Sequence, residues 1–552
     1  KGEPKPKEQP RPDSNKRRWW DYKGADCAQS IGSTVDALQK SQSARIQQQV
    51  VNQALYGNRR LNGPQRAARA RLMASQSTTR GNLITFNAVQ SIVDTGVSKV
   101  GETKPRPYFL TSGGNYKQQR KAKRLNKYVE GVFYENKTYD LTPQAFRDCA
   151  IDGDGFIFVY ERGGKIRHEP VSSLELWVDE EEAQYGKPRN LHRIQVVDRD
   201  ELAGYFGDKP DAVAAIEQVA KAKDSQSGET LSDMVSVVTS WHLGSMQPDG
   251  ELKGGSYAMA LLGGEGFMLV EPEDWPHDFF PFARVPWCPP PTGCGFWSQG
   301  LAEQLQGEQI ELNKELQFVQ RAMHLSAPKI MMPMGSKVVD EHINNEIWTV
   351  LKYAGDKVPQ FYCPEPVHQA YFENPNRIIE RMYRKAGWSE MAASATKPAG
   401  LNSGKAIREF VDETSERHKH TQKQYDAFHL QLAEITVALS IEAAEAGRLE
   451  AVRVPGKQSF DSIDFKRDLK GLKRSEFTLH CYSVSRLPKD PAGRLQTIQE
   501  HVQAGIISLR QGRKLLDFPD LEAFETLADA QENIISKTLD GIVDDGEYAP
   551  PE

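Results

Sequence analysis

Apolar residues recur at helical spacing along several stretches of the chain and predict helices there. The clearest example is residues 301–325, where the apolar side chains fall on one narrow stripe. Such a stripe is typical of a helix that packs against neighbouring helices rather than deep in a core. The stripe consists of Leu301, Leu305, Leu312, Leu316, Val319 and Met323. Similar patterns predict helices over residues 19–57, 87–100, 117–134, 200–223, 376–388, 405–446 and beyond 488.

From residue 155 onward the pattern changes to that of strands. The runs FIFVYE, KIRHEP, LELWVD and LHRIQVVDR are rich in β-forming residues and are separated by turn signals such as Arg162-Gly163-Gly164. Helices and strands are grouped rather than alternating, so the sequence predicts an α+β fold and not a parallel doubly wound sheet. Further strands are predicted at residues 235–242, 266–270, 452–465 and 477–484, with a small β-rich insert at 328–368.

Three segments lack any pattern that could bury a core. Residues 1–18 hold four prolines and charges of both signs, and they predict a disordered arm. Pro286–Gly295 (PWCPPPTGCG) predicts a rigid break, and Met391–Gly404, built from small residues with Pro and Gly, predicts a mobile loop.

Composition narrows the class of protein. A chain of 552 residues with 38% apolar content is not disordered throughout. Its longest apolar-looking stretch, Tyr257–Val270, contains Glu265 and is shorter than the about 20 residues that span a bilayer. No apolar segment of a secretory signal stands near residue 1. The six cysteines are too scattered for a disulfide framework, so a reducing compartment fits best.

The net charge of −5 conceals an asymmetry. Residues 1–140 contain 26 Lys or Arg against 11 Asp or Glu, whereas the rest of the chain contains 44 against 64. The predicted helix at 117–134 is especially basic, which indicates either a surface for nucleic acid or a solvated helix face. Both interpretations stay open. Its basic residues are Lys117, Arg120, Lys121, Lys123, Arg124 and Lys127.

No motif in the sequence supports catalysis. The segment Ala399–Ala406 lacks the first glycine and the Ser or Thr of a phosphate-binding loop. Asp152-Gly-Asp154-Gly resembles the start of a calcium loop, but Phe156 stands at the third ligand position, so a turn before a strand is the simpler interpretation. Isolated acidic residues near Lys466 are weak support for a nuclease. We therefore expect no catalytic residue, no metal site and no cofactor.

The order of the parts is more specific than any single motif. A mixed α+β body is interrupted by a helix, a β-rich insert, a second helix and a small-residue loop, and it resumes with one very long helix. In this order the chain resembles the portal proteins of tailed double-stranded DNA bacteriophages, over about residues 50–520. The segments that carry the resemblance are NAVQSIVDTGVSKVGETKPRP (87–107), RDCAIDGDGFIFVYERGGKIRHEPVSSLELWVD (147–179), FWSQGLAEQLQGEQIELNKEL (296–316), APKIMMPMGSKV (327–338) and KPAGLNSGKAIREF (397–410).

This resemblance implies a portal fold with a mixed wing, a two-helix stem, a small β-rich clip, a long wing helix and a short helical crown. The implied parts are a disordered basic arm (1–18), the N-terminal part of the wing (19–298), stem helix 1 (299–326), the clip (327–369), stem helix 2 (370–390), the tunnel loop (391–404), the rest of the wing (405–487), the crown (488–545) and an acidic tail (546–552).

The resemblance also implies a function. Portal proteins form a dodecameric ring at one capsid vertex, through which a separate terminase ATPase drives the genome and from which the genome later leaves. Such a protein belongs to the virion, is assembled in the host bacterial cytoplasm, and is neither an enzyme nor a membrane protein. The implied partners are other copies of the chain, the double-stranded DNA genome, the terminase large subunit, the major capsid protein, the scaffolding protein and the head–tail adaptor or tail proteins.

Three groups of residues are assigned by the resemblance. The apolar stripe of the first stem helix packs neighbouring copies together, and the net acidic remainder of that helix repels DNA from the channel wall. The DNA-channel residues of the tunnel loop are Lys397, Ser394, Thr396, Asn402 and Lys405. The docking residues of the clip are Lys337, Asp340, Glu341, Asn344, Asn345 and Lys352.

Two other classes of function stay open at this stage. One is a soluble, sequence-independent DNA-binding protein that uses the basic N-terminal region. The other is an enzyme of the nuclease class built on Asp461, Asp464 and Lys466. A ring with a central channel, as against small monomers, distinguishes the portal interpretation from both.

Overall fold

A computed structural model provides the structure of the chain. Nearly all described residues belong to one compact unit, residues 1–102 and 107–481. Of the second unit, residues 103–106 and 482–552, only 104–106 and 482 are described. The described residues are 18–57, 85–101, 104–110, 116–219, 233–246, 252–263, 266–325, 329–331, 360–362, 368–387, 419–455, 460–463, 465–469 and 478–482.

The described residues of the first part of the chain are largely helical, as predicted, but one predicted helix is divided. The predicted helix at 19–57 is a 3₁₀ turn followed by two helices that break at Gln42. A further helix, α6, was not predicted, and Pro143 lies inside it. These elements are η2 (Trp19–Asp21), α1 (Gly24–Ser41), α2 (Ser43–Gly57), α4 (Ala88–Gly101), α5 (Tyr116–Glu135) and α6 (Thr138–Asp152).

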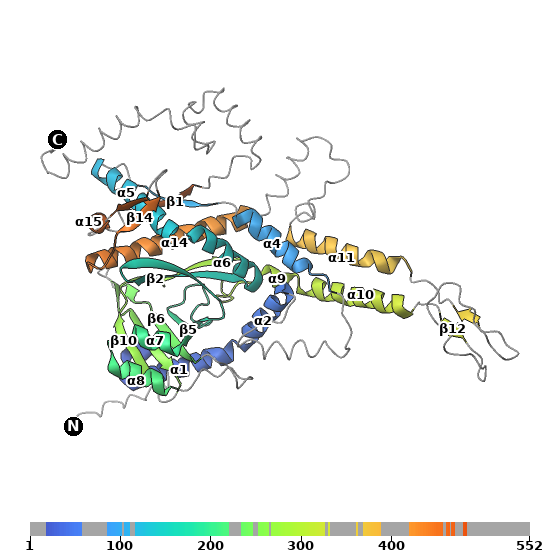
Figure 1. Ribbon diagram of the computed structural model, residues 1–552, viewed down its shortest axis with the longest axis horizontal. Coiled ribbons are helices and arrows are strands. Elements are labelled where there is room, and N and C mark those ends of the chain that lie inside the picture. Colours follow the sequence, from blue (N-terminus) through green and yellow to red (C-terminus); the bar gives the residue numbers. More distant parts are fainter. Residues whose placement is uncertain are drawn as a thin grey trace, which may run out of the picture. The chain divides into compact units, whose positions relative to one another are not determined.

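Two antiparallel sheets form the middle of the body. The three-stranded sheet has the order β11-β2-β3, and the five-stranded sheet has the order β10-β9-β6-β5-β4. Alternate side chains of β6 face opposite ways: Val238 packs with α1, whereas Val235 and Val237 pack with α7 and α8. Helices therefore cover both faces of the larger sheet (Figure 1). The bounds are β2 (Asp154–Arg162), β3 (Lys165–Val171), β4 (Leu176–Val178), β5 (Asn190–Asp198), α7 (Arg199–Tyr205), α8 (Pro210–Gln218), β6 (Met234–His242), β9 (Ser256–Leu262), β10 (Phe267–Asp274) and β11 (Phe282–Pro286).

The smaller sheet lies between two apolar clusters because its strands alternate between two faces. Phe156 faces the larger sheet and packs with Leu191 and Trp241. Ile157, the next residue, belongs to the largest core, which also holds side chains of α4, α5, α6 and the long helix α14 (Lys419–Glu445). The short β7 (Ser245–Met246) and β8 (Leu252–Lys253) pair with each other beside this assembly.

Two histidines buried beside the largest core have hydrogen-bond partners. His168 contacts Thr138 through Nδ1 (2.8 Å) and Thr436 through Nε2 (3.0 Å). His429 contacts Thr142 through Nε2 at 3.2 Å. Burial lowers the pKa of His168 to about 3 and that of His429 to about 4, so both rings are neutral at neutral pH.

The C-terminal strands complete the body. Gly131 of α5 allows β14 to approach closely, since a Cβ there would lie 2.8 Å from the Val452 side chain. The elements are β14 (Val452–Pro455), β15 (Phe460–Ile463), α15 (Lys466–Leu469) and β16 (Thr478–Tyr482), which pairs with β1 (Arg106–Leu110). Strands β1, β9 and β11 were not predicted from the sequence.

The α+β class is confirmed, since the described elements mix helices with antiparallel strands and no described pair of strands is parallel in the registers observed. Of the predicted β-rich insert, the structure describes β12 (Lys329–Met331) and β13 (Gln360–Tyr362), which pair antiparallel. The predicted arm up to residue 17, the tunnel loop and the crown lie outside the described residues, as does the part of the predicted long helix before residue 419. None of the described helices is long and apolar enough to cross a membrane.

Candidate functional site

The candidate site is a helical hairpin formed by α9 (Leu301–Gln304), α10 (Gln306–Leu325) and α11 (Ala370–Ala386). At one end the Lys385 ammonium donates to the Gln304 carbonyl (2.5 Å) and to the Glu308 carboxylate (2.8 Å). At the other end the rings of Phe318 and Tyr371 lie 5.2 Å apart. These two contacts make α10 and α11 antiparallel neighbours (Figure 1). Strand β12 follows the first helix and β13 precedes the second, so the paired strands connect at the outer end.

A glutamine fixes the root of the hairpin to α4. The Gln309 side chain is buried, and its Oε1 accepts from the backbone N–H groups of Ala88 (3.1 Å) and Val89 (3.3 Å). Its Nε2 donates to the Phe86 carbonyl at 2.7 Å. The first N–H groups of a helix have no partner inside the helix, so Gln309 supplies what α4 lacks. Replacing Gln309 leaves the Val89 N–H without an acceptor, whereas the Ala88 N–H keeps the Phe86 carbonyl.

The segment before α9 is locked by the Asp152-Gly-Asp154-Gly motif. The buried Asp154 carboxylate accepts from the Ser298 backbone N–H (2.7 Å) and from the Arg284 Nε (2.8 Å). At Gly153 a Cβ would lie 1.9 Å from the Ser298 carbonyl oxygen, so only glycine permits this approach. The predicted turn before a strand is confirmed, because Gly153 ends α6 and Asp154 begins β2. Within the described part of the chain no cluster of three His, Cys, Asp or Glu could hold a metal.

The apolar stripe of the first stem helix divides into two halves. The prediction that the whole stripe lies away from a core is wrong for Leu301, Leu305 and Leu312, which belong to the largest core of the same chain. Leu312 is 0% exposed, and no side chain described beyond it on α10 is buried. Leu316 is partly buried against that core, Val319 is half-buried, and Met323 is 57% exposed. The body therefore ends beneath α10 near Leu312, and the stripe continues past it.

Aromatic side chains add to this uncovered surface. Phe318 is 50% exposed, and Tyr371 and Phe372 at the start of α11 are both 44% exposed. The sequence analysis missed these three residues, although the adjacent Tyr371-Phe372 pair between polar residues is a visible signal. Together with Met323 they form what we call the outer apolar surface of the hairpin. The described residues leave this surface open to solvent.

The charges of the hairpin balance. The predicted net acidic surface holds for α9 and α10 alone, where four glutamates stand against Lys314 and Arg321. Helix α11 reverses this with four basic residues against Glu373 and Glu380, so the hairpin carries six charges of each sign. An acidic channel wall is therefore not a property of the described hairpin as a whole. The glutamates of α9 and α10 are Glu303, Glu308, Glu311 and Glu315, and the basic residues of α11 are Arg377, Arg381, Arg384 and Lys385.

The pair between the two helices, Lys385 and Glu308, has a marked electrostatic effect. Burial opposes ionisation of Glu308, but the hydrogen bond and charge of Lys385 outweigh it and lower the pKa of Glu308. The exposed pairs Glu311–Lys314 (3.8 Å) and Glu373–Arg377 (3.2 Å) lie within single helices. Exposed pairs of that kind contribute only about 0.3–0.5 kcal/mol each. The Lys385–Glu308 contact thus sets how the helices meet.

The predicted residues of the tunnel loop and the clip are not among those that the structure describes. Lys397, Ser394, Thr396, Asn402 and Lys405 of the tunnel loop lie outside the described residues. The clip residues Lys337, Asp340, Glu341, Asn344, Asn345 and Lys352 lie outside them too. On α5, which is described, Lys123 and Lys127 are exposed, while Leu125 and Tyr128 are buried in the largest core. The basic residues of α5 thus include an exposed pair one turn apart.

Comparison with known proteins places no constraint on these surfaces. No protein-family model and no curated protein matches the chain.

Proposed function

We propose that copies of this chain assemble side by side into a portal-type ring, whose channel conducts double-stranded DNA into and out of a virion. The observation that carries the proposal is the outer apolar surface of the hairpin. A helix that continues its apolar stripe past the edge of its own core needs a second surface to cover it. Exposed apolar surface is typical of a protein–protein contact where it is contiguous, and the exposed rings of Phe318 and Tyr371 adjoin across the hairpin, 5.2 Å apart.

Neighbouring hairpins in a ring supply that cover. Burying a Val or Met side chain completely contributes about 1.5–3 kcal/mol, so Val319 and Met323 stabilise a contact only when a neighbour covers them. Net charge supports the same arrangement. Helices α9 and α10 carry two more acidic than basic residues, and α11 carries two more basic than acidic residues. The α10 face of one copy therefore attracts the α11 face of the next, which gives a head-to-tail contact of the type that closes rings.

The equal numbers of acidic and basic residues on the hairpin are suited to a channel through which DNA passes without binding tightly. A strongly basic wall would bind the phosphate backbone tightly, since contacts to phosphate dominate affinity for DNA. A hairpin with equal numbers of both signs offers no such grip. We assign no catalytic activity to the chain, and the proposal includes docking of terminase and of adaptor or tail proteins at the insert between α10 and α11.

The test replaces the outer half of the stripe without touching the core. Val319→Glu with Met323→Glu introduces two charges on a partly exposed face, so the protomer is expected to fold. We expect the parent to elute as a high-mass ring in size-exclusion chromatography with light scattering, and the double variant to elute as protomers. Negative-stain imaging of the parent with rotational averaging is expected to resolve a central channel.

A matched control separates the apolar contact from net charge. Lys314→Gln with Gln317→Glu changes the charge of the same helix by the same amount, but on polar positions. This control is expected to retain the ring. If the parent is a monomer at all concentrations, or if Val319→Glu with Met323→Glu leaves the ring intact, the proposed role of the hairpin is wrong.

One observation favours a second candidate, a sequence-independent DNA-binding protein. Lys123 and Lys127 are exposed on α5, the helix with the densest run of basic residues. In that case the chain binds DNA as a monomer, with affinity that falls steeply as salt is raised. Lys123→Gln with Lys127→Gln would then weaken DNA binding, whereas the hairpin variant would leave DNA binding unchanged. A monomer with this behaviour would support the second candidate over the ring.

A further inference from the structure

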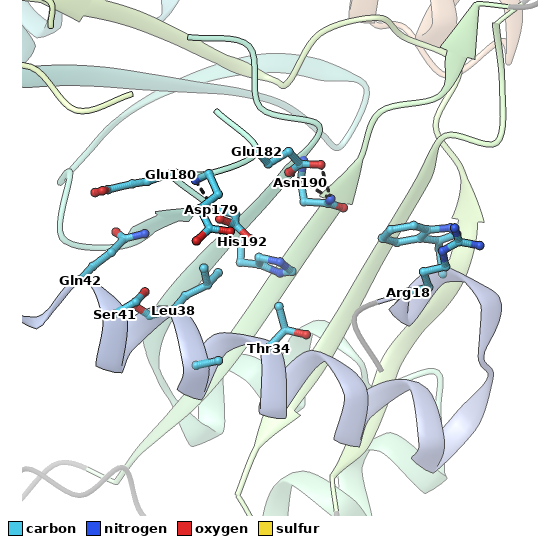
Figure 2. A pocket seen from close by; sticks show the side chains of 13 residues that line it. Arg18, Thr34, Leu38, Ser41, Gln42, Asp179, Glu180, Glu182, Asn190 and His192 are labelled. Atoms are coloured by element: carbon cyan, nitrogen blue, oxygen red, sulfur yellow. Dashed lines mark hydrogen bonds between the residues drawn. The ribbon is translucent and has the colours of Figure 1, made fainter. Parts of the chain in front are cut away.

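A pocket of about 440 Å³ lies between α1 and the turn that follows β4 (Figure 2). It belongs to the wing-like part of the body and is independent of the hairpin. Four consecutive acidic residues, Asp179 to Glu182, line one side of it. Arg18 lines the opposite side in Figure 2, so the pocket has a negatively charged side and a positively charged side.

The acidic turn is held in place by its own hydrogen bonds. The Asp179 carboxylate accepts from the Glu181 backbone N–H at 3.0 Å, and the Ala183 N–H donates to the Asp179 carbonyl at 2.8 Å. Asn190 of β5 donates to the Glu182 carboxylate at 2.9 Å. Glu180 and Glu181 are exposed and make no salt bridge with any described residue, although the buried Arg45 guanidinium interacts electrostatically with Glu180 over a longer distance. Two carboxylates are thus available at the mouth of a preformed cavity.

Two buried polar side chains that line the same pocket each have one polar atom without a hydrogen bond to any described residue. Gln42 is only 4% exposed; its Nε2 donates to the Val178 carbonyl (2.5 Å), but no described residue donates to its Oε1. His192 is 1% exposed; its Nδ1 contacts the Ser240 hydroxyl at 2.8 Å, and its Nε2 has no hydrogen bond to any described residue. A buried acceptor such as the Gln42 Oε1 is destabilising when it has no donor, so a ligand that donates hydrogen bonds is favoured.

The chemistry of that ligand follows from the polarity of these groups. The Gln42 Oε1 is an acceptor, and so are the carboxylates. Burial lowers the pKa of His192 to about 4, so the ring is neutral at neutral pH and its Nε2 accepts when the proton sits on Nδ1. A guanidinium or ammonium carries several donors and a positive charge. The side chains of Ala37 and Leu38, which also line the pocket, provide apolar surface for methylene groups.

We propose that this pocket binds a guanidinium or ammonium group at the end of an aliphatic chain, with the charged end toward the Asp179–Glu182 turn and the Gln42 carbonyl. The group comes either from a free small cation or from an arginine or lysine side chain of a protein. Both sources present the same chemistry to the pocket.

Isothermal titration calorimetry on the full chain at low ionic strength tests the proposal. The two probes are agmatine, for a free small cation, and Nα-acetyl-arginine methylamide, for an arginine side chain. We expect at least one probe to bind saturably. Glu180→Gln with Glu181→Gln is expected to weaken that binding at least tenfold. The matched control, Asp200→Asn with Glu201→Gln, removes two adjacent exposed carboxylates from α7 and is expected to bind like the parent.

A second variant tests the buried acceptor. Gln42→Met keeps the length of the side chain but removes the free oxygen together with the Nε2 donor to Val178. It is expected to weaken binding several-fold while circular dichroism and an unchanged Tm show that the parent fold is kept. Binding of agmatine identifies a free cation as the source, and binding of the arginine probe alone identifies a side chain. The proposal is overturned if neither probe binds, or if the α7 control weakens binding as much as the change at Glu180 and Glu181.

Discussion

Truncating two residues of the same stripe should have very different effects on stability. Leu312 is fully buried in the largest core, and Leu312→Ala removes three carbon atoms. At about 0.8 kcal/mol per methylene the transfer contribution is about 2.4 kcal/mol, and the cavity left behind raises the total to about 3–5 kcal/mol. Met323 is 57% exposed, so Met323→Ala should cost less than about 1 kcal/mol in the protomer.

Thermal unfolding of dilute protomers distinguishes the two variants. Unfolding entropy of about 2.1 cal/mol/K per residue gives roughly 0.8 kcal/mol/K for a cooperative unit of about 400 residues. Leu312→Ala should therefore lower the Tm by about 4–6 °C, and Met323→Ala by about 1 °C or less. At concentrations that favour assembly, Met323→Ala should show an added loss, because association stabilises the folded protomer by mass action.

Equal effects of Leu312→Ala and Met323→Ala would refute the division of the stripe into a buried and an uncovered half. If both variants lower the Tm of dilute protomers by the same amount, Met323 is buried as deeply as Leu312 and the stripe does not divide. The outer apolar surface would then be part of the core of a single chain, and the argument for a covering neighbour would fail.

Three further predictions concern other parts of the chain. Gly153→Ala should destabilise the protein by more than about 3 kcal/mol, as measured by Tm, because its Cβ would clash with Ser298. Gly163→Ala is the matched control, since Gly163 also has a positive φ (60°) but nothing lies within 4 Å of its Cβ position, and it should cost only about 1–2 kcal/mol. The pKa values of His168 and His429, about 3 and 4, lie below their unfolded value of about 6.5, so the unfolded state binds more protons. Each histidine should therefore lower stability by about 3 kcal/mol between pH 6.5 and pH 4. Asp148 and Asp152 act in the opposite direction, because burial raises their pKa values to about 6 and about 7. NMR titration of the two imidazoles isolates the histidines, and titration of either ring near pH 6.5 in the folded protein would contradict the prediction. Lys397→Glu should leave ring assembly intact but shorten the DNA retained per capsid, and full-length genomes at parental yield would argue that its loop is only a linker.

Local patterns in the sequence were enough to predict most described helices and strands. The strands β2 to β6 follow runs rich in branched and aromatic residues between turn signals, and α4, α5, α10 and α14 follow apolar spacing. Helix α6 was missed because Pro143, its sixth residue, interrupts the pattern and cannot donate the backbone hydrogen bond of a helix interior. Strand β1 was missed because Pro107 stands inside it. These failures arise where one residue has a local preference that tertiary packing overrides.

Parts of the candidate site depend on long-range contacts that no local pattern contains. The sequence places Gln309 on a polar position of a helix, but it does not indicate that α4 begins beside it. The same holds for Lys385 and Glu308, which are far apart in the chain and pair across the hairpin. The acidic turn near Asp179 was visible in the sequence, whereas its pocket depends on Gln42 and His192 from other elements.

The stripe on α10 shows most directly what periodicity leaves undetermined. Helical spacing gives the direction in which side chains point, and Leu312 and Met323 point the same way because their spacing of eleven residues is close to three turns. Spacing says nothing about what lies beneath each position. The structure supplies that information, since the body underlies the helix as far as Leu312 and ends there. The same apolar residues therefore form a core on one half of the helix and an uncovered surface on the other. It is the continuation of the pattern across this boundary, rather than the pattern itself, that argues for a neighbouring copy.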